Sequence, residues 1–541
     1  MTRQRVLAPW LAATVMAGAA LRLWGIDFGL PALLDPDELI FELGAFKMVD
    51  SGTGNPGWFG HPATTTMYVL VLVNALVYGW GRMKGQFSSP TEFAEAVFFD
   101  PGLLILPGRI AMVLFALATI VLVFHLGRRV SGARAGVFAA VMIACSPLHI
   151  AWSQVVRSDI LATTFLVASM LVAHRFSRSG SGRDLVFACV CAALAIVSKW
   201  PFAVAVLAIY GAVVVRFVEG KTTTSDAIKT GVLSTVVTIA FAILISPYLI
   251  LDYGTVASNL AGEVQEKHIG KTGGTLLANF WFYLSEPLWM SFGPLGLLLA
   301  GQGIVQLRRN AGVVAIIFVP SAVMFLIICS QNLVWERWGI ALLPALAVAA
   351  GSSLSYWFGL VGRLRASVAS VAMVAISTAL LAPLLVTSYF AARERSNDNR
   401  KLATEWTKAN VPPGSRVMVE HFAFDLADTD LDIIFPVAIA GCLDSRALLR
   451  GKVEYSEIDA NRGGNSNLDY AAVPVSQQGT CAADFAILTE FARYRAERQA
   501  FAKESAKYDA LIECGKVVAR FPAVPGEVGG KPEVIVVDLR K

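Results

Sequence analysis

The sequence has few charged residues for its size. Only 16% of its 541 residues are charged and 55% are hydrophobic, and the mean hydropathy is +0.59. Soluble proteins carry about 25% charged residues and about 45–50% apolar ones. This shortage argues against a disordered chain, a soluble doubly wound enzyme and a nucleic-acid-binding protein. The net charge of +5 is small and spread along the chain, so we interpret the chain as an integral membrane protein.

The charges are unevenly distributed. About half of them lie after residue 388, in little more than a quarter of the chain. We therefore expect a membrane domain at 1–390 and a soluble domain at 391–541, since a segment of that length can bury its own core. No signal-peptide cleavage site is evident, so the apolar run from Val6 to Trp24 predicts a first transmembrane helix.

Apolar runs of about 20 residues predict the membrane helices, because the hydrocarbon core of a bilayer is about 30 Å thick. About eleven spans are expected, at 6–24, 107–127, 135–152, 159–174, 185–198, 201–215, 228–250, 287–306, 311–329, 338–359 and 367–388. Short basic loops mark the cytoplasmic side of a membrane. They occur at Thr2–Arg5, Arg128/Arg129/Arg134, Arg175/Arg178/Arg183, Arg216/Lys221/Lys229, Arg308/Arg309 and Arg363/Arg365. Their alternation predicts a multi-pass protein of the plasma (inner) membrane with an extracytoplasmic soluble domain.

The stretch 185–215 gives the clearest hairpin prediction. As one helix it would be about 46 Å long, which is too long for the hydrocarbon core. Ser198-Lys199-Trp200-Pro201 lies in its middle and basic clusters flank it, so we expect two helices with Lys199 at the outer tip. The loop 25–106 is then also outside, with 62–80 lying along the membrane surface.

Unusual polar residues gather at the tips expected on the outer face. Asp35-Pro36-Asp37-Glu38 opens a stretch to Val49 that is typical of a helix capped by acids. The other tips carry Trp58-Phe59-Gly60-His61-Pro62, Arg157-Ser158-Asp159, the loop Glu263–Lys271 with His268, and Trp335-Glu336-Arg337. Acids, histidines and cations converging at a membrane surface favour an anionic lipid-phosphate substrate.

Further short motifs follow in order along the chain. They are Leu106-Pro107-Gly108-Arg109, Leu126-Gly127-Arg128-Arg129, Ser146-Pro147-Leu148-His149-Ile150-Ala151, Arg157-Ser158-Asp159 and Ser198-Lys199-Trp200-Pro201. Together with the acidic motif and His61-Pro62, this order resembles GT-C glycosyltransferases of glycosyltransferase family 39, which holds protein O-mannosyltransferases and lipid A aminoarabinose transferases. Ala63 and Ser158 stand where that family commonly has proline, which leaves the subfamily and the substrate open.

The resemblance implies a polytopic helical membrane domain with an external active site. Such enzymes transfer a sugar, with inversion, from a polyprenyl-phosphate donor to a hydroxyl of a protein, lipid or glycan acceptor. That chemistry needs a carboxylate to take the hydroxyl proton and cations to stabilise the leaving phosphate. The implied catalytic residues are Asp37 as general base, Glu38 and Asp159, and the implied substrate-binding residues are Lys199, Arg337, Arg157, His61 and His268. The resemblance allows a divalent metal ion, but no spacing of His and acidic residues specifies a metal site.

The soluble domain has the pattern of an α/β fold. We expect helices at 398–409 and 493–512, and strands at 416–419, 484–489 and 533–539. Its role is expected to be shaping the acceptor site. Cys442, Cys481 and Cys514 lie in this domain, where an oxidising outside compartment permits one disulfide. A Cys442–Cys481 pair is one hypothesis, since sequence does not fix connectivity.

Two other functions stay open at this point. A lipid-linked sugar transporter or flippase would need polar residues along its helices, and the helix interiors here carry few charges. A ligase that uses a polyprenyl-diphosphate donor is the second alternative. The sequence leaves open the sugar, the acceptor, the prenyl length and the oligomeric state.

Overall fold

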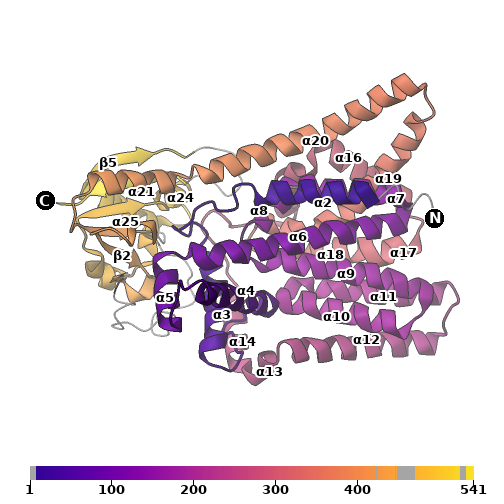
Figure 1. Ribbon diagram of the computed structural model, residues 1–541, viewed down its shortest axis with the longest axis horizontal. Coiled ribbons are helices and arrows are strands. Elements are labelled where there is room, and N and C mark those ends of the chain that lie inside the picture. Colours follow the sequence, from indigo (N-terminus) through magenta and orange to yellow (C-terminus); the bar gives the residue numbers. More distant parts are fainter. Residues whose placement is uncertain (1–7, 421–423, 445, 447–468, 524–531, 541) are drawn as a thin grey trace.

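The computed structural model describes residues 8–420, 424–444, 446, 469–523 and 532–540. Figure 1 shows an elongated molecule in which a bundle of long helices lies at one end and a β-sheet with its helices at the other. We call the end of the bundle that adjoins the sheet the sheet end, and the opposite end the remote end.

The bundle consists of long apolar helices joined by short turns. Their bounds are α2 (Ala8–Leu23), α6 (Gly102–Ser131), α7 (Ala133–Cys145), α8 (Pro147–Ser153), α9 (Ser158–Ser179), α10 (Gly182–Ser198), α11 (Ala205–Val218), α12 (Thr224–Ile245), α15 (Leu276–Tyr283), α16 (Trp289–Leu307), α17 (Ala311–Val313), α18 (Val319–Cys329), α19 (Leu343–Val361) and α20 (Ala366–Ser396). Among the described residues, nine helices are long and apolar enough to cross a membrane, or ten with the bent pair α7–α8. That number is close to the eleven spans predicted. Helix α20 continues past residue 390, where the sequence suggested a domain boundary.

One predicted feature of the helices is present and another needs correction. Helices α10 and α11 are separate, and Lys199 with the 3-10 helix η1 (Trp200–Val204) forms the turn between them. The predicted span 135–152 is instead broken into α7 and α8, which meet at an angle of 59°. Pro147 is the cause of this break, because proline disfavours the α conformation of the residue before it, and Ser146 is extended.

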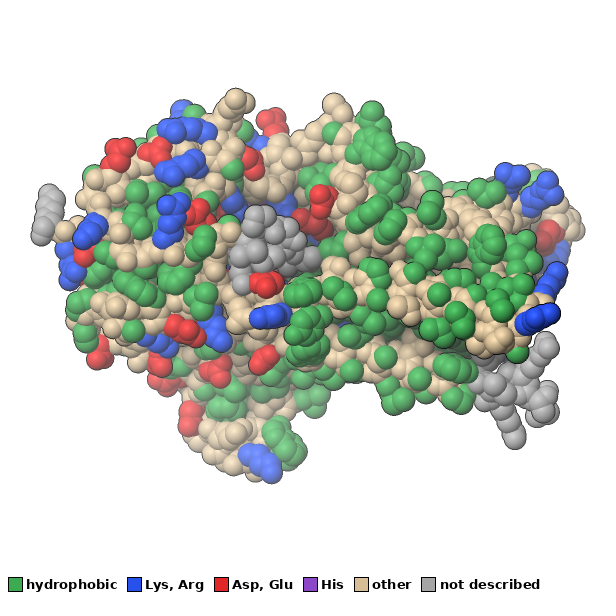
Figure 2. Space-filling view, turned by 90° about the horizontal axis from the view of Figure 1, so that it is seen from above, with side chains coloured by type: hydrophobic (Ala, Val, Ile, Leu, Met, Phe, Trp, Pro, Cys, Tyr) green, Lys and Arg blue, Asp and Glu red, His purple; other side chains and the backbone are tan. Residues whose placement is uncertain are grey.

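The cluster Thr2–Arg5 lies outside the described residues, and the clusters that are described lie at the remote end. Arg175 pairs with Asp184 at 3.0 Å, and the Arg216 guanidinium lies 5.4 Å from the centre of the Phe176 ring. Figure 2 shows Lys and Arg side chains at this end, and a largely hydrophobic surface between it and the sheet domain. This is the distribution expected of a bundle that spans a bilayer.

Five further helices, α3 (Pro36–Asp50), α4 (Thr64–Met83), α5 (Pro90–Phe99), α13 (Tyr248–Leu251) and α14 (Tyr253–Glu263), lie toward the sheet end (Figure 1). Helix α4 is long and apolar enough to cross a membrane. At its start, the Ala63 N–H donates to the Ser198 carbonyl at the end of α10. Near its other end, the Tyr78 ring contacts Phe93 of α5, and α5 contacts both α6 and the sheet domain. Both ends of α4 thus contact elements at the sheet end of the bundle. These contacts are the ones expected of a helix that lies along the membrane surface.

Within the described residues, the sheet has six strands in the order β3-β2-β1-β4-β6-β5. The strands are β1 (Arg416–Val419), β2 (Asp432–Pro436), β3 (Cys442–Asp444), β4 (Phe485–Leu488), β5 (Lys516–Phe521) and β6 (Val534–Asp538). Strand β1 is parallel to β2 and β4, and the other pairs are antiparallel. Met418 enters the core on one face, while Val417 and Val419 enter the core on the other, because successive side chains of a strand point to opposite faces.

The expected elements of this domain are present with one correction. Helix α21 (Asn399–Asn410) and strands β1, β4 and β6 lie where predicted, whereas β2, β3 and β5 were not predicted. The expected helix 493–512 is wrong, because the chain forms two helices, α24 (Phe491–Ala496) and α25 (Ala502–Glu513). The backbone leaves the helical conformation at Glu497 and at Phe501 (φ −130°, ψ 49°), and Phe501 in the turn is buried in the core.

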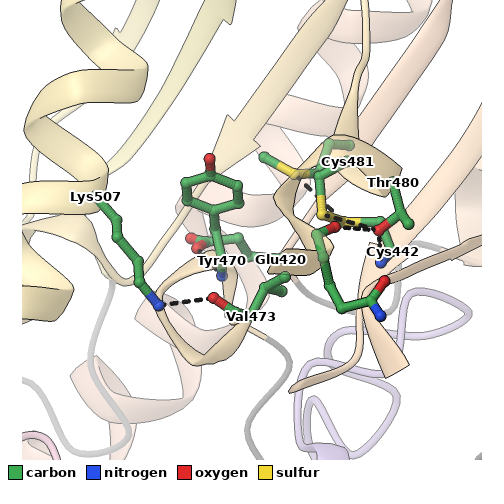
Figure 3. Close-up of a disulfide and its surroundings, with 9 residues drawn as sticks. Glu420, Cys442, Tyr470, Val473, Thr480, Cys481 and Lys507 are labelled. Atoms are coloured by element: carbon green, nitrogen blue, oxygen red, sulfur yellow. Dashed lines mark hydrogen bonds between the residues drawn. A yellow bond between two sulfur atoms is a disulfide. The ribbon is translucent and has the colours of Figure 1, made fainter. Parts of the chain in front are cut away.

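The sheet domain contains a disulfide near its edge. Cys442 in β3 is bonded to Cys481 at the end of the 3-10 helix η8 (Val475–Cys481) (Figure 3), so the hypothesised pairing is confirmed. Cys514 is a free, exposed thiol. The bond ties the edge strand to the segment that precedes β4.

Glu420 is a buried acid at the carboxyl end of β1. Its carboxylate accepts hydrogen bonds from the backbone N–H groups of Tyr470 (3.0 Å) and Glu490 (2.9 Å) and from the Tyr508 hydroxyl. Figure 3 shows Glu420 beside Tyr470. Burial raises the pKa of Glu420 to about 7, although these donors oppose the rise. The acid thus joins β1 to the turns after β4 and before η8.

Close approach of two helices gives a first prediction. A Cβ atom added to Gly303 in α16 would lie 2.0 Å from the Ala349 carbonyl oxygen of α19. Gly303→Val should therefore force these helices apart and destabilise the protein by about 1–3 kcal/mol, as overpacking does. The neighbouring Gly301 has open space around it, so Gly301→Val is the matched control. Melting temperatures of both variants in the same detergent test this, and equal melting temperatures would contradict it.

Candidate active site

Charged side chains from four parts of the chain meet at the sheet end of the bundle. They come from the start of α3, the segment between α8 and α9, the turn after α10, and the segment before α19. We call this set the charged cluster, and its members are Asp35, Asp37, Arg157, Asp159, Lys199 and Arg337.

Asp35 and Asp37 both bind Arg157. Asp35, not Asp37, is the N-cap of α3, and its carboxylate accepts a hydrogen bond from the Asp37 N–H at 3.1 Å. Arg157 donates to Asp35 at 2.8 Å and also contacts one carboxylate oxygen of Asp37. The Asp37 side chain keeps 26% of its surface exposed. Asp37 is therefore the member of this trio with access to a substrate.

The charge state of Asp37 follows from its surroundings. Burial raises its pKa, but the attraction of Arg157, Arg337 and His61 is larger in sum, and the pKa falls to about 2. The position of Asp37 in the first turn of α3 also suits an anion. Asp37 is thus a carboxylate at any physiological pH.

Lys199 and Asp159 form the second ion pair of the cluster. The Lys199 Nζ lies 2.6 Å from an Asp159 oxygen, and both side chains are at least nine-tenths buried. Lys199 follows the end of α10 in an extended conformation, while Asp159 lies in the first turn of α9. Burial lowers the pKa of Lys199, and so does the charge of Arg337, although Asp159 opposes the shift.

Arg337 has a different environment from the other cations. It is 7% exposed, and its guanidinium carbon lies 3.9 Å from the Trp335 ring centre and 5.7 Å from that of Trp152. Its Nε and Nη1 atoms are buried with no hydrogen-bond partner among the described residues. An unpaired buried cation is costly. Arg337 is therefore suited to bind an anion that the protein itself does not supply.

His61 is buried beside the cluster and is uncharged. Burial and the charge of Lys199 lower its pKa to about 3, although Asp159 opposes the shift. The ring packs edge-on against Trp58 at 4.8 Å, and its Nδ1 has no partner among the described residues. A neutral imidazole can offer a hydrogen bond here without adding charge.

Two predicted residues lie outside the charged cluster. Glu38 is fully buried, and it binds Arg109 through two hydrogen bonds, of 2.8 and 2.6 Å. It also accepts the Val156 N–H at 2.9 Å. The expectation of a catalytic Glu38 therefore needs correction, because a side chain so enclosed supports the segment before Arg157 instead of facing a substrate. His268 lies nearby, with its ring 5.2 Å from Trp335.

Sequence reasoning missed several contributors. Asp35 and Arg109 belong to motifs that the sequence analysis names without giving either residue a role, although an arginine in an apolar run is itself a signal. No local pattern marks Trp152 and Trp335 as partners of Arg337. Glu263 at the end of α14 is attracted by Lys199 and Arg337 and repelled by Asp37. Burial raises its pKa.

The described side chains do not suit a metal ion. No group of three or more His, Cys, Asp or Glu side chains in the described part of the chain is placed to hold one. The nearest acids are already bound by cations, since Asp35 and Asp37 contact Arg157 and Asp159 contacts Lys199. We therefore derive no step through a metal.

Comparisons with known proteins identify the fold. Residues 97–251 match the family described as dolichyl-phosphate-mannose-protein mannosyltransferase. ArnT from Cupriavidus metallidurans in the apo state is similar over 100% of this chain and 99% of its own, with a TM-score of 0.56 and 13% identity. The chain has the GT-C glycosyltransferase fold. No curated protein sequence matches it.

Two further structures with this GT-C fold carry lipid phosphates. ArnT from Cupriavidus metallidurans bound to undecaprenyl phosphate has a TM-score of 0.55 and 14% identity, over 98% of each chain. The archaeal oligosaccharyltransferase AglB from Archaeoglobus fulgidus, in complex with an inhibitory peptide and a dolichol-phosphate, has a TM-score of 0.52 and 14% identity, over 95% of this chain and 73% of its own. The nine or ten long apolar helices of the described part of the chain, together with the GT-C fold, make this chain a multi-pass membrane protein.

The Glu38–Arg109 pair gives a second prediction. Glu38→Gln leaves the buried Arg109 charge with only the Ile26 and Phe28 carbonyls and no counter-charge, which should destabilise the fold by roughly 3–5 kcal/mol. The double variant Glu38→Met with Arg109→Met removes both charges and should be less destabilised than Glu38→Gln. Melting temperatures of the purified proteins measure this. A double variant less stable than the single one would show that the pair does more than neutralise two charges.

Proposed function

We propose that the protein transfers a sugar from a polyprenyl-phosphate donor to an acceptor hydroxyl at the outer face of the membrane. The observation that carries this proposal is Arg337, a buried cation with two unpartnered donors, next to the carboxylate of Asp37. A site that holds an unsatisfied cation beside an ionised acid suits a substrate with a leaving phosphate and a nucleophilic hydroxyl.

In this proposal Lys199 and Arg337 bind the donor phosphate. Both are buried at the sheet end of the bundle, where the phosphate of a membrane lipid would lie while its prenyl chain stays in the bilayer. Hydrogen bonds between a cation and a phosphate are short and strong. The solved ArnT complex with undecaprenyl phosphate supports a ligand of this class.

Asp37 acts as the general base in the transfer step. The acceptor oxygen attacks the anomeric carbon from the face opposite the phosphate, and its proton passes to Asp37. The bond between the anomeric carbon and the phosphate oxygen breaks, and polyprenyl phosphate leaves with the bonding electrons. One displacement inverts the anomeric centre. Asp35 and Arg157 position Asp37, and Lys199 and Arg337 stabilise the charge that develops on the phosphate.

The two parts of the chain have separate roles in this scheme. We assign the transfer chemistry to residues 1–390, including the outer loop 25–106, and the shaping of the acceptor site to residues 391–541. The acceptor is a hydroxyl of a protein, lipid or glycan. His61 and His268 are placed next to the cluster as further substrate contacts.

Sugar transfer by the purified protein tests the proposal. Labelled sugar should pass from a polyprenyl monophosphate donor to an acceptor fraction, and a diphosphate donor should not replace it. Asp37→Asn should lower the rate by roughly 10²–10⁴-fold, the usual loss for a missing acid or base. Asp100→Asn is the matched control, since the Asp100 carboxylate accepts the Gly102 N–H at the start of α6, outside the charged cluster. Asp37→Asn protein with more than about a tenth of the activity would remove the base role.

The low pKa of Asp37 predicts the pH dependence of the reaction. Because Asp37 stays ionised above a pH of about 2, the wild-type rate should show no acid limb from this group between about pH 5 and 8. Arg157→Gln removes the largest attraction while the effect of burial remains, so the Asp37 pKa should rise and an acid limb should appear. Plots of kcat/KM against pH measure this, and a flat profile in both proteins would contradict it.

The outward orientation predicts the labelling of introduced cysteines. In a Cys514→Ser background, Ser51→Cys at the sheet end should react in whole cells with a thiol reagent that cannot cross the membrane. Ser131→Cys at the remote end should react only after the membrane is opened. Both positions are exposed. The opposite pattern would place the charged cluster on the cytoplasmic side.

A further inference from the structure

The loop between α14 and α15 is anchored in the sheet domain. Ile269 is 5% exposed and belongs to the core that also contains Tyr494 and Phe501. On either side of it, the Gly270 N–H donates to Glu497 at 2.7 Å, and the Lys267 ammonium donates to the Ala500 carbonyl at 2.7 Å. These contacts hold the turn 267–270 against the α24–α25 connection, so a bundle loop takes its position from the other domain.

The same loop is joined to the segment that leads into Arg337. Thr272 and Leu333 form an antiparallel bridge. The Val334 N–H donates to the Lys271 carbonyl at 2.9 Å, and the Gly273 N–H donates to the Asn332 carbonyl at 2.7 Å. Residues 271–273 and 332–334 are therefore held together as one paired segment.

Asn279 strengthens this junction. Its buried side chain accepts the Gly274 N–H at 2.8 Å and donates to the Cys329 and Gln331 carbonyls at 3.0 and 2.9 Å. The paired segments are thereby fixed to the start of α15 and the end of α18. This leaves the turn 267–270 as the part of the loop whose position depends on the sheet domain.

The paired segments 271–273 and 332–334 lie next to Trp335, the ring on which Arg337 stacks. Lys271 pairs with Glu336 at 2.6 Å and lies 5.5 Å from the Trp335 ring, while His268 contacts the same ring from the turn. Arg337 forms no hydrogen bond or ion pair that would fix its guanidinium among the described residues. Its position is set by its stacking on Trp335 and Trp152.

We propose that Ile269 is a positioning residue for Arg337, through which the sheet domain sets the geometry of the phosphate contact. The proposal rests on the proposed function, in that Arg337 is taken to bind the donor phosphate. Ile269 fixes the turn 267–270, the turn holds His268 against the Trp335 ring, and the Arg337 guanidinium stacks on that ring. A guanidinium held only by ring stacking is sensitive to such a displacement, because cation–π attraction depends on the position of the cation over the ring.

A double-mutant cycle on polyprenyl phosphate binding tests this proposal. The probe is a polyprenyl monophosphate without sugar, titrated into the full-length protein in nanodiscs. Ile269→Ala should weaken binding by about tenfold, which corresponds to part of a charge-assisted contact to the phosphate. In an Arg337→Gln background, Ile269→Ala should cause no further loss, because the group through which it acts is gone. Ile269→Val should restore most of the affinity.

The controls separate this inference from the proposed function. Ile439→Ala removes an exposed apolar side chain of the sheet domain and should leave the affinity unchanged. Equal losses from Ile269→Ala with and without Arg337 would overturn the positioning role, as would wild-type affinity in Ile269→Ala. If Arg337→Gln alone binds the lipid normally, the phosphate role of Arg337 fails instead. Melting temperatures of all variants identify any loss caused by unfolding of the sheet domain.

Discussion

The acidic run at the start of α3 is the constraint on which the charged cluster depends. Asp35 and Asp37 bind Arg157, while Glu38 binds Arg109 and the Val156 N–H. Three acids at the start of α3 thus fix this helix to α6 and to the segment between α8 and α9. In a poorly solvated place none of these charges is stable alone, so the ion pairs form together and hold the segments in register.

The different surroundings of neighbouring acids separate their roles. Asp37 and Glu38 are adjacent in sequence and face different parts of the protein because successive residues of a helix lie on different sides. Asp37 stays partly exposed and ionised beside Arg157, whereas Glu38 is enclosed with Arg109. Asp37 is therefore a carboxylate that a substrate can reach, whereas the Glu38–Arg109 pair holds the start of α3 in place. Arg337 differs again, since its guanidinium stacks on two aromatic rings and forms no ion pair with the nearby acids among the described residues.

The sheet domain is connected to the charged cluster by contacts that run through the bundle loops. Arg400 of α21 donates to the Leu34 carbonyl at 2.9 Å, next to the cap of α3, and Ile269 enters the sheet-domain core from the other side. The sheet domain therefore contacts both the segment that leads into Asp35 and the loop that lies next to Trp335 and Arg337. Displacing it would alter both at once, which gives a physical basis for coupling between an acceptor held by the sheet domain and the chemistry at the bundle.

The sequence by itself determined the membrane character, the two-part division and the chain positions of the charged tips. Hydrophobic runs and basic loops indicate from local sequence alone which segments lie in lipid and which lie in water. The hairpin at Lys199 and the helix that begins at the acidic run 35–38 could therefore be predicted from them. The partners of those charges could not. That Arg157 binds Asp37, that Lys199 binds Asp159, and that Arg337 lies between two tryptophans depends on contacts between residues far apart in sequence. Burial and pairing belong to the packed tertiary structure, and they alone decide which acid is reachable and which cation is left without a partner.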